Sequence, residues 1–289
     1  MLITLKEALA HAEQHHYAVG MFGCYCEEMV RAIVEAGEES RSPVILGFGE
    51  GHIQYNKVHL EDISSLMINY AKRASIPVVV HLDHGFTYEN VVRAIHHNFS
   101  SVMIDASSAP YEENVSLCAE ISRIAHTVGC SVEAEIGHVG GSEDSNRDAD
   151  ENDQYTVPED AARFAEATGV DALAVAIGTA HGTYRKAPRL DLQRLEEIHR
   201  KVPIPLVLHG GSGIPDDMVR KAISLGVCKV NVNTECQIAF TEATRKFIED
   251  GKDLTGNGFT PRALLADGLV ATKEKCIEKM TLFGSLGKA

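Results

Sequence analysis

The sequence predicts a single-domain (β/α)8 barrel, an α/β TIM barrel, over residues 1–289, and three observations lead to this fold class. Eight short apolar runs recur along the chain, at 18–23, 43–48, 77–83, 101–107, 131–137, 172–178, 205–210 and 229–235. The segments between them have helical periodicity. No GxGxxG motif follows the first run, so an open, doubly wound sheet is the less favoured alternative. Eight strands that alternate with helices favour a closed parallel barrel.

The connecting segments carry the expected helix signals. Residues 158–169 (PEDAARFAEATG) place Pro in a first helical turn and Gly just after the last turn, and residues 215–226 repeat this arrangement. Residues 27–40 place four apolar side chains on one helical face, namely Met29, Val30, Ile33 and Val34. A further C-terminal helix is expected at about 260–283. The polar stretch at about 140–156 is expected to be a long mobile loop, because strands and helices alternate on both sides of it.

Composition excludes several classes of partner. The 27 basic and 41 acidic residues give a net charge of −14, which disfavours binding to nucleic acid. A small anionic substrate is compatible with this charge, because a local site can still be positive. No basic-then-apolar leader and no apolar run of about 18 residues is present, so we expect neither secretion nor a membrane partner. The seven cysteines, without a CxxC pair, suit buried thiols in a reducing cytoplasm.

Polar residues stand where the predicted strands end, which in a barrel is one shared mouth. The stretch VVVHLDHGFT (78–87) shows the pattern, because an apolar strand runs directly into imidazoles and a carboxylate. The residues expected at the mouth are Asp83, His84, Asp105, Glu133, Glu135, His181, His209, Asn231 and Asn233. They are distant in sequence, and the barrel would bring them together.

Three of these residues are histidines, which indicates a metal site. His84, His181 and His209 around one centre would leave an open position, as a catalytic Zn²⁺ requires. Imidazole also suits other divalent transition metals, so zinc is favoured rather than proven. His81 is an alternative to His84, because it lies deeper in the same strand on the face of Asp83.

Glycine-rich turns follow the last strands. They are HGGSGI (209–214), GTAHG (178–182) and the segment NVNT (231–234), and barrel phosphate sites cluster in this region. A metal, a phosphate site and carboxylates together suit aldol cleavage, in which the metal polarises a carbonyl and a carboxylate moves a proton.

At these residues the chain resembles the class II, zinc-dependent ketose-bisphosphate aldolases, including the fructose- and tagatose-bisphosphate types. The resemblance covers nearly the whole chain and is carried by AVGMF, SPVIL, HLDHG, SVMIDAS, EENV, VEAEIGHVGG, HGTY, LVLHGGSGI, KVNVNTE and EKMTLFGS. It implies a (β/α)8 barrel that forms a homodimer or higher oligomer. It also implies reversible cleavage of a ketose phosphate into dihydroxyacetone phosphate and an aldehyde.

The resemblance also implies residue roles. The second histidine of HLDHG becomes a zinc ligand, so His84 is chosen over His81, together with His181 and His209. Asp105 and Glu135 resemble carboxylates near an alternative, inner metal position. Asp83 resembles the group that handles the hydroxyl proton at the cleaved bond, and Glu143 resembles the acid/base at the dihydroxyacetone phosphate carbon. The phosphate lining is implied to be Gly182, Gly210, Gly211, Ser212, Asn231, Asn233 and Thr234, with a monovalent cation nearby.

Two positions depart from the family pattern. Gly23 stands where the family has Asn, and Gly49 stands where it has Ser, and both family residues help to hold the aldehyde half. Each glycine removes a side-chain hydrogen bond, and a charge-assisted bond contributes roughly 1.5–3 kcal/mol. We therefore expect an aldehyde that is larger or unphosphorylated. The alternative is fructose 1,6-bisphosphate itself, with other side chains replacing the lost contacts; Asn233 is closer to the fructose type than to the tagatose type.

Three rival functions follow from the same residues. Lys229 could form a Schiff base, but its place near the start of the last strand predicts a structural lysine at the lower rim. A non-catalytic sugar-phosphate sensor could dispense with Asp83 and Glu143, which are both present. A metal-dependent epimerase would use the same aldol cleavage followed by re-addition.

Overall fold

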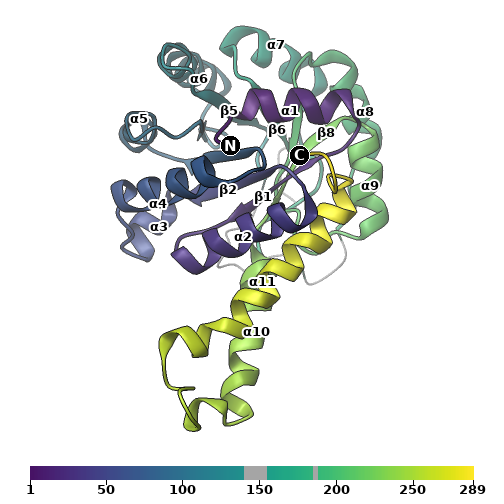
Figure 1. The fold of residues 1–289 in the computed structure, drawn as a ribbon. Helices are drawn as coiled ribbons and strands as arrows, with labels where there is room; N and C mark the ends of the chain where they lie inside the picture. Colours follow the sequence, from purple (N-terminus) through teal and green to yellow (C-terminus); the bar gives the residue numbers. More distant parts are fainter. Residues whose placement is uncertain (140–154, 185–187) are drawn as a thin grey trace.

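The protein is a closed barrel of eight parallel strands in chain order, with β1 paired to β8, which confirms the predicted fold class. The structure is a computed structural model that describes residues 1–139, 155–184 and 188–289 (Figure 1). The strands are β1 (Val19–Gly23), β2 (Val44–Gly49), β3 (Val78–Gly85), β4 (Ser101–Ile104), β5 (Ser131–Ile136), β6 (Ala172–Val175), β7 (Leu206–Leu208) and β8 (Val227–Val232).

Helices surround the barrel, and the C-terminal part of the chain projects from it (Figure 1). They are α1 (Leu5–Gln14), α2 (Glu27–Ser40), α3 (Gly51–Tyr55), α4 (Leu60–Arg73), α5 (Tyr88–His96), α6 (Tyr111–His126), α7 (Pro158–Thr168), α8 (Leu192–Lys201), α9 (Asp216–Ser224), α10 (Thr234–Glu249) and α11 (Pro261–Phe283), with a 3-10 turn at Lys252–Leu254. Within the described parts of the chain, no helix combines the length and apolar character needed to cross a bilayer.

The core has two parts. A large cluster fills the layer between the strands and the outer helices, and it includes the predicted apolar face of α2. A smaller cluster lies inside the barrel, where Met21, Ile45, Val79 and Val207 pack toward the apolar face of α1. This helix closes the end where the strands begin, so the interior there is mainly apolar, and the mouth of the barrel lies at the opposite end.

Several predicted strands extend beyond the observed ones. Asp105 and His209 directly follow β4 and β7 rather than ending them, and Asn233 is the residue before α10 rather than part of β8. The predicted ends were wrong because the last residues of these apolar runs leave the ladder to form the mouth. Gly210, with φ of 65°, is one such residue.

Strand β3 contains an irregularity at His84. The register between β3 and β4 shifts between Leu82 and Gly85, and His84 has φ of 45°. In a regular strand, Asp83 and His84 would face opposite sides of the sheet. A left-handed non-glycine residue costs of order 1–3 kcal/mol. The irregularity brings both side chains to the mouth, which a regular strand could not do.

Candidate active site

Three imidazoles meet at the carboxyl end of the barrel. His84 Nε2 lies 3.1 Å from His181 Nε2 and 3.2 Å from His209 Nδ1. Two nitrogens bound to one tetrahedral Zn²⁺ at about 2.0–2.1 Å would be about 3.3 Å apart. All three ligand atoms lie within 4.8 Å of one another, so together they could hold one divalent ion.

In two of these rings, the nitrogen that does not face the other imidazoles lies next to a carboxylate. Asp105 Oδ2 lies 2.7 Å from His84 Nδ1, and Glu133 Oε1 lies 2.9 Å from His209 Nε2. Metal-binding histidines usually donate their other N–H to such a partner, which fixes the tautomer and turns the lone pair toward the ion. The donor set and its support both fit a zinc site.

A second group of potential ligands shares one histidine with the first. His84, Asp105 and Glu135 offer atoms within 4.8 Å of one another. Asp105 Oδ1 accepts hydrogen bonds from the backbone N–H and the hydroxyl of Ser107, and Glu135 Oε1 accepts one from the N–H of Val139. The structure thus brings together the carboxylates that the sequence suggested for an inner metal position.

The electrostatics of the cluster suit a cation. Burial lowers the pKa of His181 and of His209 well below the ordinary value, and nearby His84 lowers both further. Burial also opposes a charge on His84, but Asp83 and Asp105 raise its pKa to about 10. Burial raises the pKa of Glu135 to about 8, with Asp105 adding to the shift. The carboxylates that stabilise a proton on His84 would equally stabilise a metal ion in its place.

Beneath the histidines lies a buried ion pair. Lys229 Nζ lies 3.0 and 2.8 Å from the two oxygens of Glu133, and both residues are fully buried. Lys229 is paired in register with Val19, the first residue of β1, as its predicted place toward the lower end of the barrel requires, but its side chain is buried inside the barrel and not at the rim. Sequence alternation placed Glu133 on the face of Glu135, but its contact with His209 was not foreseen, since partners on different strands have no sequence signal.

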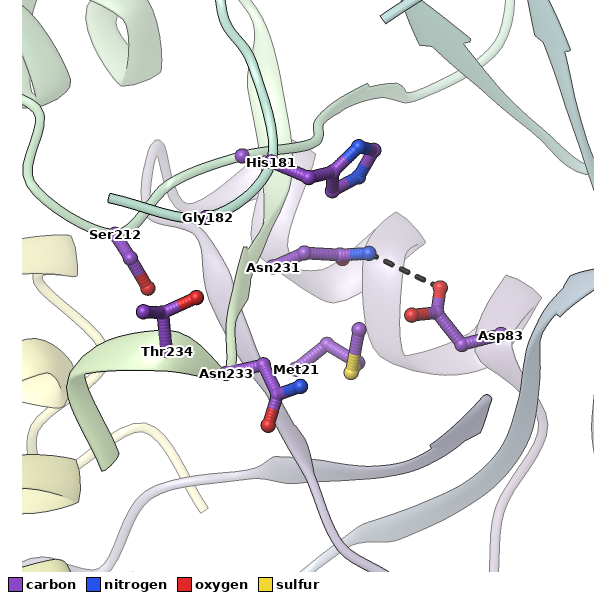
Figure 2. Close-up of a pocket in the computed structure, with 9 residues that line it drawn as sticks. Met21, Asp83, His181, Gly182, Ser212, Asn231, Asn233 and Thr234 are labelled. Carbon is purple, nitrogen blue, oxygen red and sulfur yellow. Dashed lines mark hydrogen bonds between the residues drawn. The ribbon is translucent and has the colours of Figure 1, made fainter. Parts of the chain in front are cut away.

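Most of the predicted phosphate residues line one pocket beside His181. Its walls are Met21, Asp83, His181, Gly182, Gly210, Ser212, Asn231, Asn233 and Thr234. Figure 2 shows the hydroxyls of Ser212 and Thr234 on one side and the Asp83 carboxylate on the other. Gly211 is the exception, because it packs on β8 and its N–H donates to the Asn231 carbonyl at 2.9 Å.

Asp83 has a fixed orientation in this pocket. Asn231 Nδ2 donates to Asp83 Oδ1 at 3.1 Å (Figure 2), which leaves the other carboxylate oxygen available. The predicted acid/base Glu143 lies outside the described residues.

Tyr184 was not singled out from the sequence. Its hydroxyl accepts from the N–H of Ala180 at 2.8 Å and donates to the carbonyl of Gly210 at 3.0 Å. This hydroxyl ties the loop that carries His181 to the loop that carries Ser212, and so joins the metal and phosphate sides of the site.

The two departing glycines are not equivalent in the structure. A Cβ at Gly23 would lie 2.3 Å from Asn233 Oδ1, so the Asn233 carboxamide already fills that space. A Cβ at Gly49 would meet nothing closer than 3.7 Å, from His52. Another amide thus occupies the space at Gly23, whereas the space at Gly49 is open, and the loss of the two aldehyde contacts stays a prediction.

The fold and this site define a barrel enzyme of the aldolase type, and comparison with known proteins identifies the family. The family described as "Fructose-bisphosphate aldolase class-II" matches residues 3–288. A 6-phospho-5-dehydro-2-deoxy-D-gluconate aldolase from Bacillus licheniformis is 43% identical, over 99% of this chain and 96% of the relative. A fructose-bisphosphate aldolase from Geobacillus stearothermophilus is 44% identical, over 100% of this chain and 99% of the relative.

A solved structure agrees with these relatives. The YdjI aldolase from Escherichia coli K12 superposes with a TM-score of 0.88 at 37% identity and covers 100% of both chains. The chain belongs to the class II fructose-bisphosphate aldolase family and is a carbon–carbon lyase of the aldehyde-lyase class. The family implies a divalent metal and a sugar-phosphate substrate.

Proposed function

We propose that this enzyme reversibly cleaves a ketose phosphate into dihydroxyacetone phosphate and an aldehyde, with Zn²⁺ held by His84, His181 and His209. The single observation that carries the proposal is that His181 Nε2 and His209 Nδ1 both lie within hydrogen-bonding distance of His84 Nε2, beside the pocket that most of the predicted phosphate residues line. When bound, the metal would polarise the substrate carbonyl.

Side chains and backbone groups of the protein would bind the phosphate and transfer the protons. The phosphate of dihydroxyacetone phosphate would lie against Ser212, Thr234 and the first turn of α10, where backbone N–H groups favour an anion. Asp83, oriented by Asn231, would take the hydroxyl proton as the carbon–carbon bond breaks and return it during condensation. We assign the proton at the dihydroxyacetone phosphate carbon to Glu143.

A monovalent cation beside the phosphate is part of the same proposal. Asn231 Oδ1 is buried and has no hydrogen-bond donor among the described residues. An acceptor of this kind is a suitable ligand for a hard cation.

All seven cysteines are free thiols, which suits a reducing compartment such as the cytoplasm.

The aldehyde half is proposed to be larger than glyceraldehyde 3-phosphate or unphosphorylated. The open space at Gly49 supports this, because the side chain that the family resemblance places there is missing. The two relatives are almost equally similar and bear names for different substrates, so identity does not choose between them. Fructose 1,6-bisphosphate cleavage is the alternative, and the Asn233 carboxamide beside Gly23 is the observation in its favour. Epimerisation would need the same metal and carboxylates.

Chelation separates metal-dependent from Schiff-base chemistry. We expect EDTA treatment to abolish deuterium incorporation into dihydroxyacetone phosphate in D2O, and Zn²⁺ to restore it, because the carbonyl would lose its electrophile. The exchange is followed by NMR. Activity that persists in EDTA and is inactivated by borohydride with substrate would instead identify Lys229 as a Schiff-base lysine.

The projecting pair α10 and α11 is proposed to form a homodimer interface with a second copy of this chain. Figure 1 shows α10 extending away from the barrel and α11 returning to it along α2, so that the far ends of both helices project. We call the projecting part of α10, α11 and their connection the arm. It carries exposed apolar side chains, namely Ile238, Ile248, Leu254, Phe259 and Val270. The arm of a second copy of this chain would bury these exposed apolar side chains.

The double substitution Leu254→Asp/Phe259→Asp tests this interface. We expect it to convert a dimer into a monomer, because two charges would face apolar surface that the partner buries. Light scattering with size-exclusion chromatography measures the mass. Val128→Asp, an exposed apolar position on the barrel away from the arm, is the matched control. A wild-type protein that is monomeric at micromolar concentration would contradict the proposal.

A further inference from the structure

We propose that His52 determines specificity by binding a hydroxyl group of an unphosphorylated polyhydroxy aldehyde, in space that Gly49 leaves open. This inference rests on the proposed aldol reaction and goes further by naming the chemical class of the aldehyde. Four features of the described residues carry it: the place of Gly49, the open space above it, the fixed position of His52 and the chemistry of its ring.

The open space borders the proposed proton-transfer group. Gly49 is the last residue of β2 and is paired in register with Asp83 of β3. A Cβ at Gly49 would lie 3.9 Å from the backbone oxygen of Asp83. An aldehyde whose carbonyl reaches the Asp83 carboxylate can therefore extend its remaining carbons over Gly49.

His52 faces the same space. A Cβ at Gly49 would lie 3.7 Å from His52 Cδ2 and 4.0 Å from His52 Nε2, which are ordinary van der Waals distances. An atom of a bound ligand in that position would touch the imidazole without any clash. Within residues 1–139, 155–184 and 188–289, neither ring nitrogen of His52 has a hydrogen-bond partner. The ring is therefore available to a ligand.

Ring contacts hold the imidazole in place. The His52 ring lies 4.5 Å from the ring of Tyr25, centroid to centroid, and 5.9 Å from that of Phe48. Tyr25 follows β1 and Phe48 belongs to β2, so the contacts come from two neighbouring strand ends. A ring packed in this way loses little further freedom when it binds a ligand.

Glu50 ties the segment of His52 to the end of β3. Its buried carboxylate accepts hydrogen bonds from the N–H groups of Phe86 and Thr87, at 2.6 and 3.1 Å, and from the side chain of Asn90 at 2.8 Å. The N–H of Glu50 donates to the backbone oxygen of Asp83 at 3.2 Å. Glu50 is thus a positioning residue that keeps His52 at a constant distance from Asp83.

The chemistry of this wall suits a hydroxyl better than a phosphate. A neutral imidazole offers one donor and one acceptor, which a sugar hydroxyl can satisfy together. A phosphate dianion is usually held by guanidinium or ammonium groups or by clustered N–H donors. The Asp83 carboxylate belongs to the residue paired with Gly49 in the barrel, and a negative charge there disfavours a second anion. The substrate class that fits is an aldehyde with free hydroxyls on its distal carbons.

The test compares aldehydes in condensation with dihydroxyacetone phosphate. The panel contains D-glyceraldehyde 3-phosphate and unphosphorylated tetroses, pentoses and hexoses of both configurations. We expect at least one unphosphorylated sugar to have the higher kcat/KM in the wild-type enzyme. His52→Ala should lower kcat/KM for that sugar by about 5- to 50-fold, the range expected when one hydrogen bond is lost in a desolvated site. Gly49→Ser should lower it similarly, because the hydroxymethyl group fills the space.

Two controls keep the result interpretable. His59→Ala removes an exposed histidine of the same connection, at a helix start where its side chain makes no capping bond, and should change no rate by more than about twofold. Deuterium exchange into dihydroxyacetone phosphate, a half-reaction without aldehyde, should be the same in His52→Ala as in the wild type. Thermal unfolding confirms that each variant is folded.

The outcomes separate the two proposals. If the wild-type enzyme exchanges deuterium but prefers glyceraldehyde 3-phosphate to every unphosphorylated sugar, the role of His52 is wrong and the aldol chemistry stands. The same conclusion follows if His52→Ala affects all aldehydes equally or none. If no exchange occurs with Zn²⁺ present, the proposed function itself fails.

Discussion

Replacing His84 by alanine is expected to lower kcat/KM for aldol cleavage by at least about 10³-fold, since Lewis-acid stabilisation is worth several kcal/mol. His84 Nε2 is the nitrogen that approaches both other imidazoles, so its loss leaves only two protein ligands in the first metal group. The same carboxylates would remain, and Asp105 would lose its 2.7 Å partner.

Metal content is the measurement that tests the site apart from activity. We expect the wild-type protein to retain close to one zinc per chain after dialysis, and His84→Ala to retain much less. His96→Ala, which removes an exposed histidine at the end of α5, is the matched control. If His84→Ala binds zinc as tightly as His96→Ala does, the three-histidine site is not the metal site.

Replacing Lys229 by methionine is expected to reduce the free energy of unfolding by about 3–5 kcal/mol, because it leaves the buried Glu133 carboxylate without its cation. Both side chains are fully buried, so water cannot replace the lost ammonium group. Chemical denaturation monitored by circular dichroism provides the measurement. The metal-free protein is used, so that zinc binding does not mask the loss.

The double variant Glu133→Gln/Lys229→Met distinguishes the two roles of this pair. Removing both charges should restore much of the stability, because buried ion pairs are often replaceable by neutral groups. Zinc affinity should nevertheless remain about 10–100-fold lower, since His209 Nε2 would lose the carboxylate that lies 2.9 Å from it. Restored stability with unchanged zinc affinity would show that Glu133 only neutralises Lys229.

The fold could be predicted because its signals are local. Short apolar runs alternate with amphipathic segments, and Pro and Gly mark helix ends, as in α7, which begins at Pro158 and is followed by Gly169. Strand ends were less predictable, because a polar residue after an apolar run can stay in the ladder, as Asp83 does in β3, or leave it, as Asp105 and His209 do after β4 and β7.

The candidate site could be predicted in outline for a similar reason. A closed parallel barrel places every strand's carboxyl end at one mouth, so His181 and His209 were expected beside a histidine of β3, and the family resemblance chose His84 over His81 for that position. Contacts between strands were not predictable in the same way. That Glu133 supports His209 and pairs with Lys229 depends on side-chain directions across the barrel, which no single segment encodes.

By itself, the sequence determined the barrel, the identity of the three histidines and the glycines at positions 23 and 49, because each depends on residue type and order along the chain. Only the tertiary structure decided that His84 turns into the mouth through a left-handed backbone, although strand alternation alone would place it on the opposite face from Asp83. Only the tertiary structure decided that Asn233 fills the space at Gly23, whereas the space at Gly49 stays open beside His52. The physical reason is that occupied volume depends on neighbours from other strands and loops, and these become neighbours only when the barrel closes.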